Sequence, residues 1–170
     1  MYHKFLLLYC WFIRSSLFFL PDIPLFMRFR GWLYGIFMKK CGKDFQVTHD
    51  VILKDIQHIS IGKHCFVGNH AVIMGRGKIE IDDEVLIAPH VLIISSNHGS
   101  VNGSYRYGQG SIGNIKIGRG CWVAGNSTIA RDSSLPANSI LSANSLLNKN
   151  YVLPNAIYGG VPAKLIKELL

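Results

Sequence analysis

Residues 61 to 73 read IGKHCFVGNHAVI and place the aliphatic residues Ile61, Val67 and Ile73 six positions apart. An α-helix repeats its apolar positions every three or four residues, and a half-buried strand alternates every second residue. A period of six fits neither pattern. It predicts short strands joined by tight corners, three to a turn, that stack as a parallel β-helix with the aliphatic residue pointing inward.

The same period continues through most of the remaining chain. The aliphatic positions are Ile61, Val67, Ile73, Ile81, Ile87, Ile93, Ile117, Val123, Ile129, Leu135, Leu141 and Leu147. A residue of small or moderate size follows most of them by four places, and we expect Cys65 and Cys121, which stand there, to point inward as thiols of the core. The four cysteines lack metal-type spacing, so we interpret them as reduced thiols of a cytosolic protein.

The period is interrupted between Ile93 and Ile117, which are twenty-four positions apart. Twenty-four is a multiple of six, so the strands resume in phase after a loop insertion over residues 95 to 114. A loop of this length in a compact domain is usually functional. If each turn contributes three strands, His70 and His90 share one face about 4.8 Å apart, and Asn126 continues their column.

The first quarter of the chain has a different character. Residues 1 to 43 hold seven lysines and arginines against the single acid Asp22. Phe5 to Ile13 is an apolar run too short to span a bilayer, and residues 25 to 40, LFMRFRGWLYGIFMKK, mix aromatic residues with cations. This pattern favours a segment that lies on the inner face of a cell membrane rather than one that binds nucleic acid. Packing on the domain or on a partner subunit is the alternative.

Four stretches carry a resemblance to a known family. They are residues 61 to 73, VLIAPHVLIISSNH (85 to 98), IKIGRGCWVAGNSTI (115 to 129) and YGGVPAKLIKEL (158 to 169). In these stretches the chain resembles the hexapeptide-repeat O-acetyltransferases, and within them the branch that modifies sugars and surface polysaccharides. The resemblance implies an all-β, left-handed parallel β-helix over residues 45 to 155. A hydrophobic, helical segment (1 to 44) precedes it, and a tail with a short helix (156 to 170) follows it.

The resemblance also implies an activity and its site. A homotrimer would bind acetyl-CoA in the groove between subunits, without a metal, and transfer the acetyl group to a sugar hydroxyl in polysaccharide biosynthesis. His98, at the start of the loop, matches the catalytic histidine, and an imidazole suits a general base because its ordinary pKa is about 6.5. Gly125 and Ala143 match positions facing the pantetheine arm. The nucleotide and its phosphates are assigned to Asn148, Lys149, Lys164 and Lys167.

The acceptor is less well defined by the sequence. Asn69 and His70 lie on the column that leads toward Gly125 and are candidates to contact the sugar, although a plain outward stack fits them equally well. Tyr105 in the loop can stack on a sugar or close the loop on its neighbour. Trp122 is interpreted as a packing residue. No nucleophilic serine motif is present, so direct transfer without a covalent enzyme intermediate is expected. Three alternatives stay open: N-acetylation of an amino sugar, a zinc-dependent enzyme of the carbonic anhydrase type, and a non-catalytic trimeric scaffold.

Overall fold

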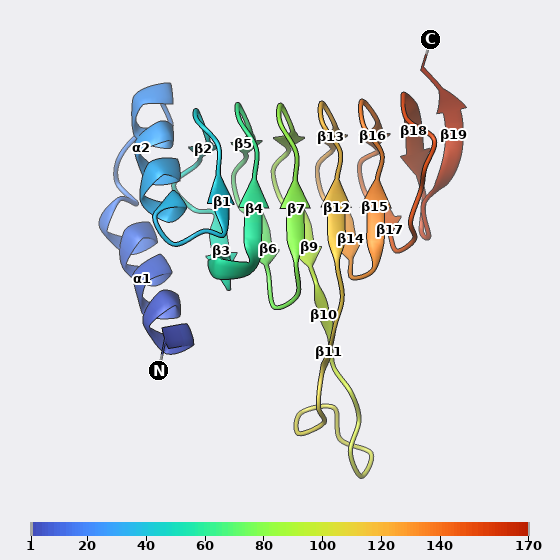
Figure 1. The fold of residues 1–170 in the computed structure, drawn as a ribbon, viewed down its shortest axis with the longest axis horizontal. Helices are drawn as coiled ribbons and strands as arrows, with labels where there is room; N and C mark the ends of the chain where they lie inside the picture. Colours follow the sequence, from blue (N-terminus) through green and yellow to red (C-terminus); the bar gives the residue numbers. More distant parts are fainter. Residues whose placement is uncertain (1, 170) are drawn as a thin grey trace.

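A computed structural model describes residues 2–169, most of which wind into a three-sided prism of short parallel strands (Figure 1). Met1 and Leu170, the ends of the two predicted terminal segments, lie outside the described residues. The prism makes five complete turns, and one further strand begins a sixth. The predicted left-handed parallel β-helix is therefore confirmed.

Each turn contributes one strand to each of three sheets, which we call faces A, B and C. Face A consists of β1 (Lys40–Cys41), β4 (Ile59–Ile61), β7 (Ile79–Ile81), β12 (Ile115–Ile117) and β15 (Ser133–Leu135). Face B consists of β2 (Gln46–Val47), β5 (Phe66–Val67), β8 (Leu86–Ile87), β13 (Trp122–Val123), β16 (Ile140–Leu141), β18 (Ala156–Gly159) and β19 (Lys164–Glu168). Face C consists of β3 (Ile52–Lys54), β6 (Val72–Met74), β9 (Leu92–Ile94), β14 (Thr128–Ala130) and β17 (Leu146–Leu147).

The aliphatic residues of the six-residue period fill the prism, as predicted. On face B, for example, Val67, Ile87 and Val123 are at most 1% exposed and stack in register through successive turns. The small positions also point inward, and several of them are serines. Buried Ser127 donates a hydrogen bond of 2.8 Å to the carbonyl oxygen of Ser142, so its hydroxyl is satisfied inside the core.

The first turn lies mostly within the predicted range of residues 45 to 155, but outside the six-residue period that begins at Ile61. Val47 and Leu53 occupy inward positions of β2 and β3, and both are buried. They stand six positions apart, but the next inward residue, Ile61, follows after eight because the 3₁₀ turn η1 (Ile56–His58) lies between. That longer step hid the first turn, which begins at β1, ahead of the predicted start at residue 45.

Two helices lie across the amino-terminal end of the prism (Figure 1). Helix α1 (Tyr2–Ser16) packs on β3, and α2 (Pro24–Gly35) packs on β2. Their inward residues Leu6, Ile13 and Tyr34 are buried against the first turn. We call these two helices the cap, because they cover the open end of the prism and its unpaired edge.

The predicted carboxy-terminal helix is wrong, because residues 164–168 form strand β19, which pairs antiparallel with β18. Gly160 has a φ of 101°, and the chain turns there through Val161 and Pro162. Lys164 to Glu168 can therefore close the last edge of face B. The helix was predicted from the family resemblance. The hydrogen-bonding edge that β18 leaves open favours a strand instead.

Candidate functional site

The predicted loop is a narrow arm that leaves the third turn at the corner between faces C and A (Figure 1). Its base is a two-stranded ladder of β10 (Ser96–Asn97) and β11 (Ser111–Ile112). Beyond the ladder the two backbones run so close together that a Cβ on Gly108 would lie 1.9 Å from the carbonyl oxygen of Gly99. The glycines of the arm therefore permit this close backbone approach.

His98 lies immediately after β10, and its side chain is exposed. Its backbone N–H donates to Asn97 Oδ1 at 2.9 Å, which holds the start of the arm. Among residues 2–169, the imidazole of His98 has no hydrogen-bond partner, and Tyr105 farther out is 66% exposed. Within one chain, no hydrogen bond from another side chain orients this imidazole.

The corner between faces B and C is built on a uniform plan. His70, His90, Asn126 and Asn144 all adopt left-handed backbone conformations, with φ between 57° and 61°. Asparagine and histidine tolerate this conformation better than most residues. Successive turns are linked by backbone hydrogen bonds, such as the 2.9 Å bond from the N–H of His90 to the carbonyl of Asn69.

The rings of His70 and His90 stack along this corner. Their centroids are 4.7 Å apart and their planes differ by 25°. The predicted column of histidines is therefore confirmed, and the backbone bond from Asn126 to Pro89 (3.2 Å) shows that Asn126 continues it. His70 also lies 3.0 Å from Asp50 through its Nδ1 atom, so the ring is held from two sides.

A cluster around Asp22 adds to this corner, and the sequence analysis missed it. Asp22 Oδ2 lies 2.7 Å from His49 Nδ1 and accepts a hydrogen bond of 3.1 Å from Asn69 Nδ2. Its other oxygen, Oδ1, pairs at 2.9 Å with Arg30, a buried guanidinium. Asp22 connects α1 to α2, so the cap and the corner meet here. The available signal was that Asp22 is the only acid in residues 1 to 43.

Burial raises the pKa of Asp22, but hydrogen bonds from His49 and Asn69 together lower it more, so the pKa of this carboxyl lies below its usual range. The carboxylate is therefore charged at neutral pH. It fixes the amide of Asn69, whose Nδ2 also lies 3.4 Å from Asp50. The amide oxygen of Asn69 then faces away from both acids.

Gly125 and Ala143 occupy the same corner in the fourth and fifth turns. The N–H of Asn144 donates 3.1 Å to the carbonyl of Gly125, which places the two residues on consecutive turns. The backbone N–H groups of Ala124 and Gly125 lie at this corner. The N–H of Ala124 already donates to the carbonyl of Leu141 at 2.9 Å. The N–H of Gly125, by contrast, has no backbone hydrogen-bond partner among the described residues.

The predicted nucleotide-binding residues lie at the carboxy-terminal end of the prism. Asn148 and Lys149 are exposed and follow β17 at the corner between faces C and A. Lys164 pairs with Gly159, and Lys167 pairs with Ile157. Gly159 and Ile157 lie on one face of β18, and a bulge shifts the register between the two pairs. Both lysines therefore lie on the same face of β19, although three positions separate them.

Burial removes the cysteines from the candidate chemistry. All four thiols are free. Burial raises the pKa of Cys65 and of Cys121 to about 11, and their sulfurs lie 3.1 Å and 2.9 Å from the carbonyl oxygens of Asp82 and Pro136. A buried protonated thiol is a poor nucleophile, so these two cysteines fit the core role that was predicted for them.

One chain does not bring the candidate residues together. His98 lies beyond the corner between faces C and A, whereas Asn69, His70, Gly125 and Ala143 line the corner between B and C, along another edge of the prism. In residues 2–169 no cluster of three or more His, Cys, Asp and Glu side chains is suited to a metal ion. Within the same range, no helix has the length and apolar character to cross a bilayer.

Comparison with known proteins adds evidence on the fold. No family model matches the sequence, and no curated protein matches it. Among solved structures, a hexapeptide-repeat acetyltransferase of Vibrio cholerae, determined with acetyl coenzyme A, is 22% identical with a TM-score of 0.83, over 98% of this chain and 88% of the other. A maltose O-acetyltransferase of Clostridium difficile is 22% identical with a TM-score of 0.84, over 96% of this chain and 86% of the other.

A more distant structural match acts on nitrogen. A variant of the N-acyltransferase AntD of Bacillus cereus, bound to dTDP-4-amino-4,6-dideoxyglucose and coenzyme A, is 17% identical with a TM-score of 0.65, over 82% of this chain and 88% of the other. The two acetyltransferases superpose over almost the whole chain, the cap included. This chain therefore has the left-handed β-helix fold of the hexapeptide-repeat acetyltransferases.

Proposed function

We propose that the protein transfers an acetyl group from acetyl-CoA to a sugar hydroxyl, with His98 as general base, in a site shared between two subunits of a homotrimer. The observation that carries this proposal is the order of the candidate residues along the axis of the prism. Asn69 and His70 lie in the second turn, Gly125 and Ala143 in the fourth and fifth, and the arm with His98 leaves the third. Along the prism axis, the arm that carries His98 therefore starts between these two groups of residues.

A three-fold axis parallel to the prism would preserve these heights, because rotation about such an axis involves no translation along it. With face C turned toward the axis, the corner between C and A of one subunit would lie beside the corner between B and C of the next. His98 of one subunit would then reach the level of His90 on its neighbour. Gly125 lies two strand spacings from Asn69, roughly 10 Å, which is enough room for an acetyl group and a hydroxyl.

The outward residues of faces A and C support an oligomer of this kind. The outward row of face A is polar and carries Ser60, Glu80, Lys116 and Ser134. The outward row of face C is mainly apolar and carries Ile52, Val72, Leu92, Thr128 and Leu146, all partly exposed in the single chain. Apolar rows of this length are usually covered, so face C suits the centre of a trimer and face A suits solvent.

The proposed chemistry needs no covalent intermediate. The imidazole of His98 takes the proton of the acceptor hydroxyl as its oxygen attacks the thioester carbonyl. The N–H of Gly125 can donate to the oxyanion that forms, because its ladder position leaves this donor free. The C–S bond then breaks, and the imidazolium returns the proton to the departing thiolate. Asn148, Lys149, Lys164 and Lys167 would hold the nucleotide and its phosphates.

For the acceptor we propose a sugar that lies against Asn69, His70 and, from the arm, Tyr105. The cluster of Asp22, Asp50 and Asn69 offers charged and amide oxygens, which are suitable partners for sugar hydroxyls. A role in surface polysaccharide biosynthesis and a cytoplasmic location with peripheral membrane association belong to the same proposal. The better superposition with the maltose O-acetyltransferase than with the N-acyltransferase favours oxygen over nitrogen as the acceptor atom.

The test is to incubate the purified protein with acetyl-CoA and a panel of sugars and amino sugars, and to follow thiol release and product mass. We expect an acetylated product that mild base cleaves, since an ester is labile and an amide is not. A base-stable product would support N-acetylation instead. Absence of acetyl-CoA binding would favour the scaffold, and activity abolished by a zinc chelator would favour the metalloenzyme. Light scattering should give the mass of a trimer.

A further inference from the structure

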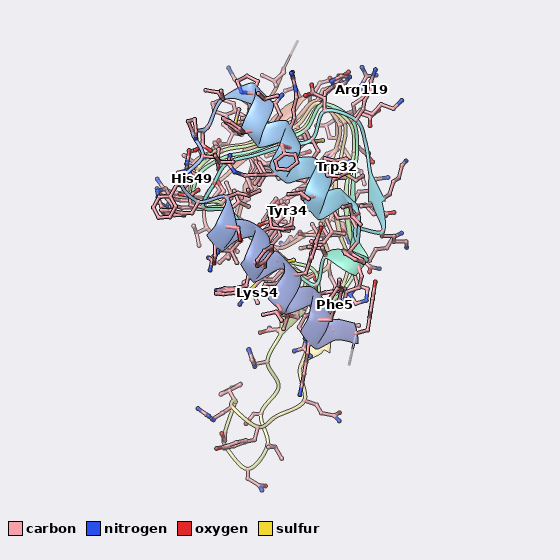
Figure 2. The ribbon with its side chains drawn as sticks, turned by 90° about the vertical axis from the view of Figure 1, so that its left-hand side faces the viewer. Phe5, Trp32, Tyr34, His49, Lys54 and Arg119 are labelled. Carbon is pink, nitrogen blue, oxygen red and sulfur yellow. The ribbon has the colours of Figure 1, made fainter. Side chains whose placement is uncertain are left out.

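We propose that the outer surface of the cap is a docking surface for an anionic lipid bilayer, formed by α1 and α2 together, so that the prism stands end-on to the membrane. The cap covers the amino-terminal end of the prism with both helices exposed (Figure 2). Phe5 on α1 and Trp32 on α2 mark this surface, whereas Tyr34 lies on the buried side.

Each helix of the cap is apolar on two opposite sides. The inward side of α2 carries Met27, Gly31 and Tyr34, all buried. Its outward side carries a second apolar stripe at helical spacing: Leu25, Phe29, Trp32 and Ile36, which are 67%, 44%, 62% and 52% exposed. A helix with an apolar stripe on its outward side as well as its inward side is expected to have that outward stripe covered too, by protein or by lipid.

Helix α1 repeats this arrangement. Leu6, Cys10 and Ile13 face the prism, and the outward side carries Phe5, Leu8, Trp11 and Phe12, each at least half exposed. A hollow of about 350 Å³ on this side is lined by Phe5, Leu8, Tyr9, Trp11 and Phe12. Phe, Trp and Leu on one side of a helix are the residues that enter the boundary between headgroups and acyl chains. An apolar hollow of this size suits lipid acyl chains.

The charge around the cap favours an anionic bilayer, rather than a second copy of the chain, as the partner of this surface. The exposed or partly exposed cations around the cap are Lys4, Arg14, Arg28, Lys39, Lys40 and Lys43, of which Arg28 is paired with Asp44. Asp22, the only acid in residues 2 to 43, is paired with Arg30 and His49. Two caps placed face to face would bring like charges together, whereas a surface of anionic lipid attracts every one of these cations. The surface therefore has the charge as well as the apolarity of an interfacial membrane-binding segment.

End-on docking gains its functional meaning from the proposed activity, on which it rests. The candidate site lies along the side of the prism, so an end-on enzyme would hold it a few turns above the bilayer. In the proposed trimer, rotation about an axis parallel to the prism places three caps in one plane, and their weak affinities combine. Sugars linked to lipid would be presented at that height.

The binding test uses the full-length protein and vesicles of phosphatidylcholine with or without phosphatidylglycerol. The chain has three tryptophans, of which Trp11 and Trp32 lie on the cap and Trp122 lies on face B. We expect anionic vesicles to shift the fluorescence emission of the Trp122→Phe protein to the blue, and lipids brominated on the acyl chain to quench it. The Trp11→Phe/Trp32→Phe protein, which retains only Trp122, should show neither change.

Point variants separate the two components of binding. Phe29→Ser/Trp32→Ser should weaken co-sedimentation at least tenfold, and Val152→Ser/Ile166→Ser, exposed apolar residues at the other end, should leave it unchanged. Removing Lys39, Lys40 and Lys43 together should weaken binding by roughly 100-fold at low salt, at about fivefold for each cation. Deletion of residues 1 to 20 is less informative, because it also uncovers the first turn and leaves the α2 stripe intact.

Failure of this inference is distinguishable from failure of the proposed activity, because vesicle binding is measured without acetyl-CoA and acetyl transfer is measured without vesicles. Unchanged emission and no co-sedimentation with anionic vesicles would overturn the membrane proposal. So would a change of assembly mass in Phe29→Ser/Trp32→Ser without lipid, since the stripe would then be an interface between protein copies. Quenching of native Trp11 and Trp32 keeps the test valid even if a variant folds poorly.

Discussion

Two corners of the prism follow different rules. Between faces B and C, every turn advances by six residues from one inward residue to the next, from Val47 and Leu53 to Leu141 and Leu147. Between faces C and A, the step is eight, eight, twenty-four and six. The constant corner keeps its residues stacked in columns, whereas the variable corner tolerates insertions because the extra residues project into solvent. One corner supplies a rigid surface, and the other carries the arm.

Insertion of one alanine at each corner tests this difference with the largest expected effect. After Asn126 the insertion shifts the phase of β14, so Ile129 can no longer point inward without disrupting the ladder. We expect the free energy of unfolding to fall by about 4 kcal/mol or more. After Gly103, where an added Cβ meets nothing within 4 Å, the loss should stay below about 0.5 kcal/mol. Urea unfolding monitored by circular dichroism measures both, and equal losses would show that the corners do not differ.

The next prediction compares His98 on the arm with His90 on the corner between faces B and C, which we call the constant corner. His98→Ala should lower kcat by roughly 10²- to 10⁴-fold, as expected for loss of a general base, with acetyl-CoA binding almost unchanged. His90→Ala, the matched control, removes one ring of the stack and should keep most of the turnover. Steady-state kinetics and acetyl-CoA titration are needed for both variants. If the outcomes are reversed, the base lies on the constant corner and the arm only closes the site.

The link between the cap and the constant corner is tested by Asp22→Asn. Arg30 is 1% exposed and would lose its charged partner, so we expect a loss of about 2 kcal/mol in the free energy of unfolding. Glu80→Gln is the control, because its pair with Lys78 is largely exposed and should contribute under about 0.5 kcal/mol. Equal effects of the two substitutions would contradict a specific role for the Asp22 cluster.

The pH dependence of this difference follows from the lowered pKa of Asp22. A carboxyl group whose folded pKa is depressed contributes its full stability above its unfolded pKa of about 3.9, and that stability is lost as the pH falls through the folded pKa. The gap between the natural protein and Asp22→Asn should therefore close as the pH falls below about 4. Unfolding curves measured above and below that pH check the sign, and a gap that widens in acid would contradict it.

The smallest expected effect concerns the two lysines that the bulge of β19 places on one face. Lys164→Ala/Lys167→Ala should raise the KM for acetyl-CoA about tenfold and change kcat less than about twofold, because phosphates are bound equally before and during the reaction. Lys116→Ala, an exposed lysine on face A, should change neither quantity. A loss of kcat with an unchanged KM would place these lysines near the reacting atoms instead.

Much of the fold could be predicted from local pattern alone. Ile61, Val67 and Ile73 already imply inward positions on three faces, because only a turn of three short strands buries every sixth residue. The same phase predicted the stack of His70 on His90. The short carboxy-terminal helix was predicted wrongly, since the edge that β19 closes is formed by distant residues and leaves no periodic trace in the segment itself. The only sign in the sequence that Asp22 has a special place was that no other acid occurs in residues 1 to 43.

The sequence by itself determined the period, the inward residues and the length of the arm, because burial of one side chain in six is a local constraint repeated along the chain. The tertiary structure alone decided which edges of the prism carry the candidate residues. It placed Asp22 beside Asn69, forty-seven positions away, and set His98 on a different edge from Gly125. Such proximities depend on how the turns stack and on how the cap folds back over them, and no local pattern of residues encodes either.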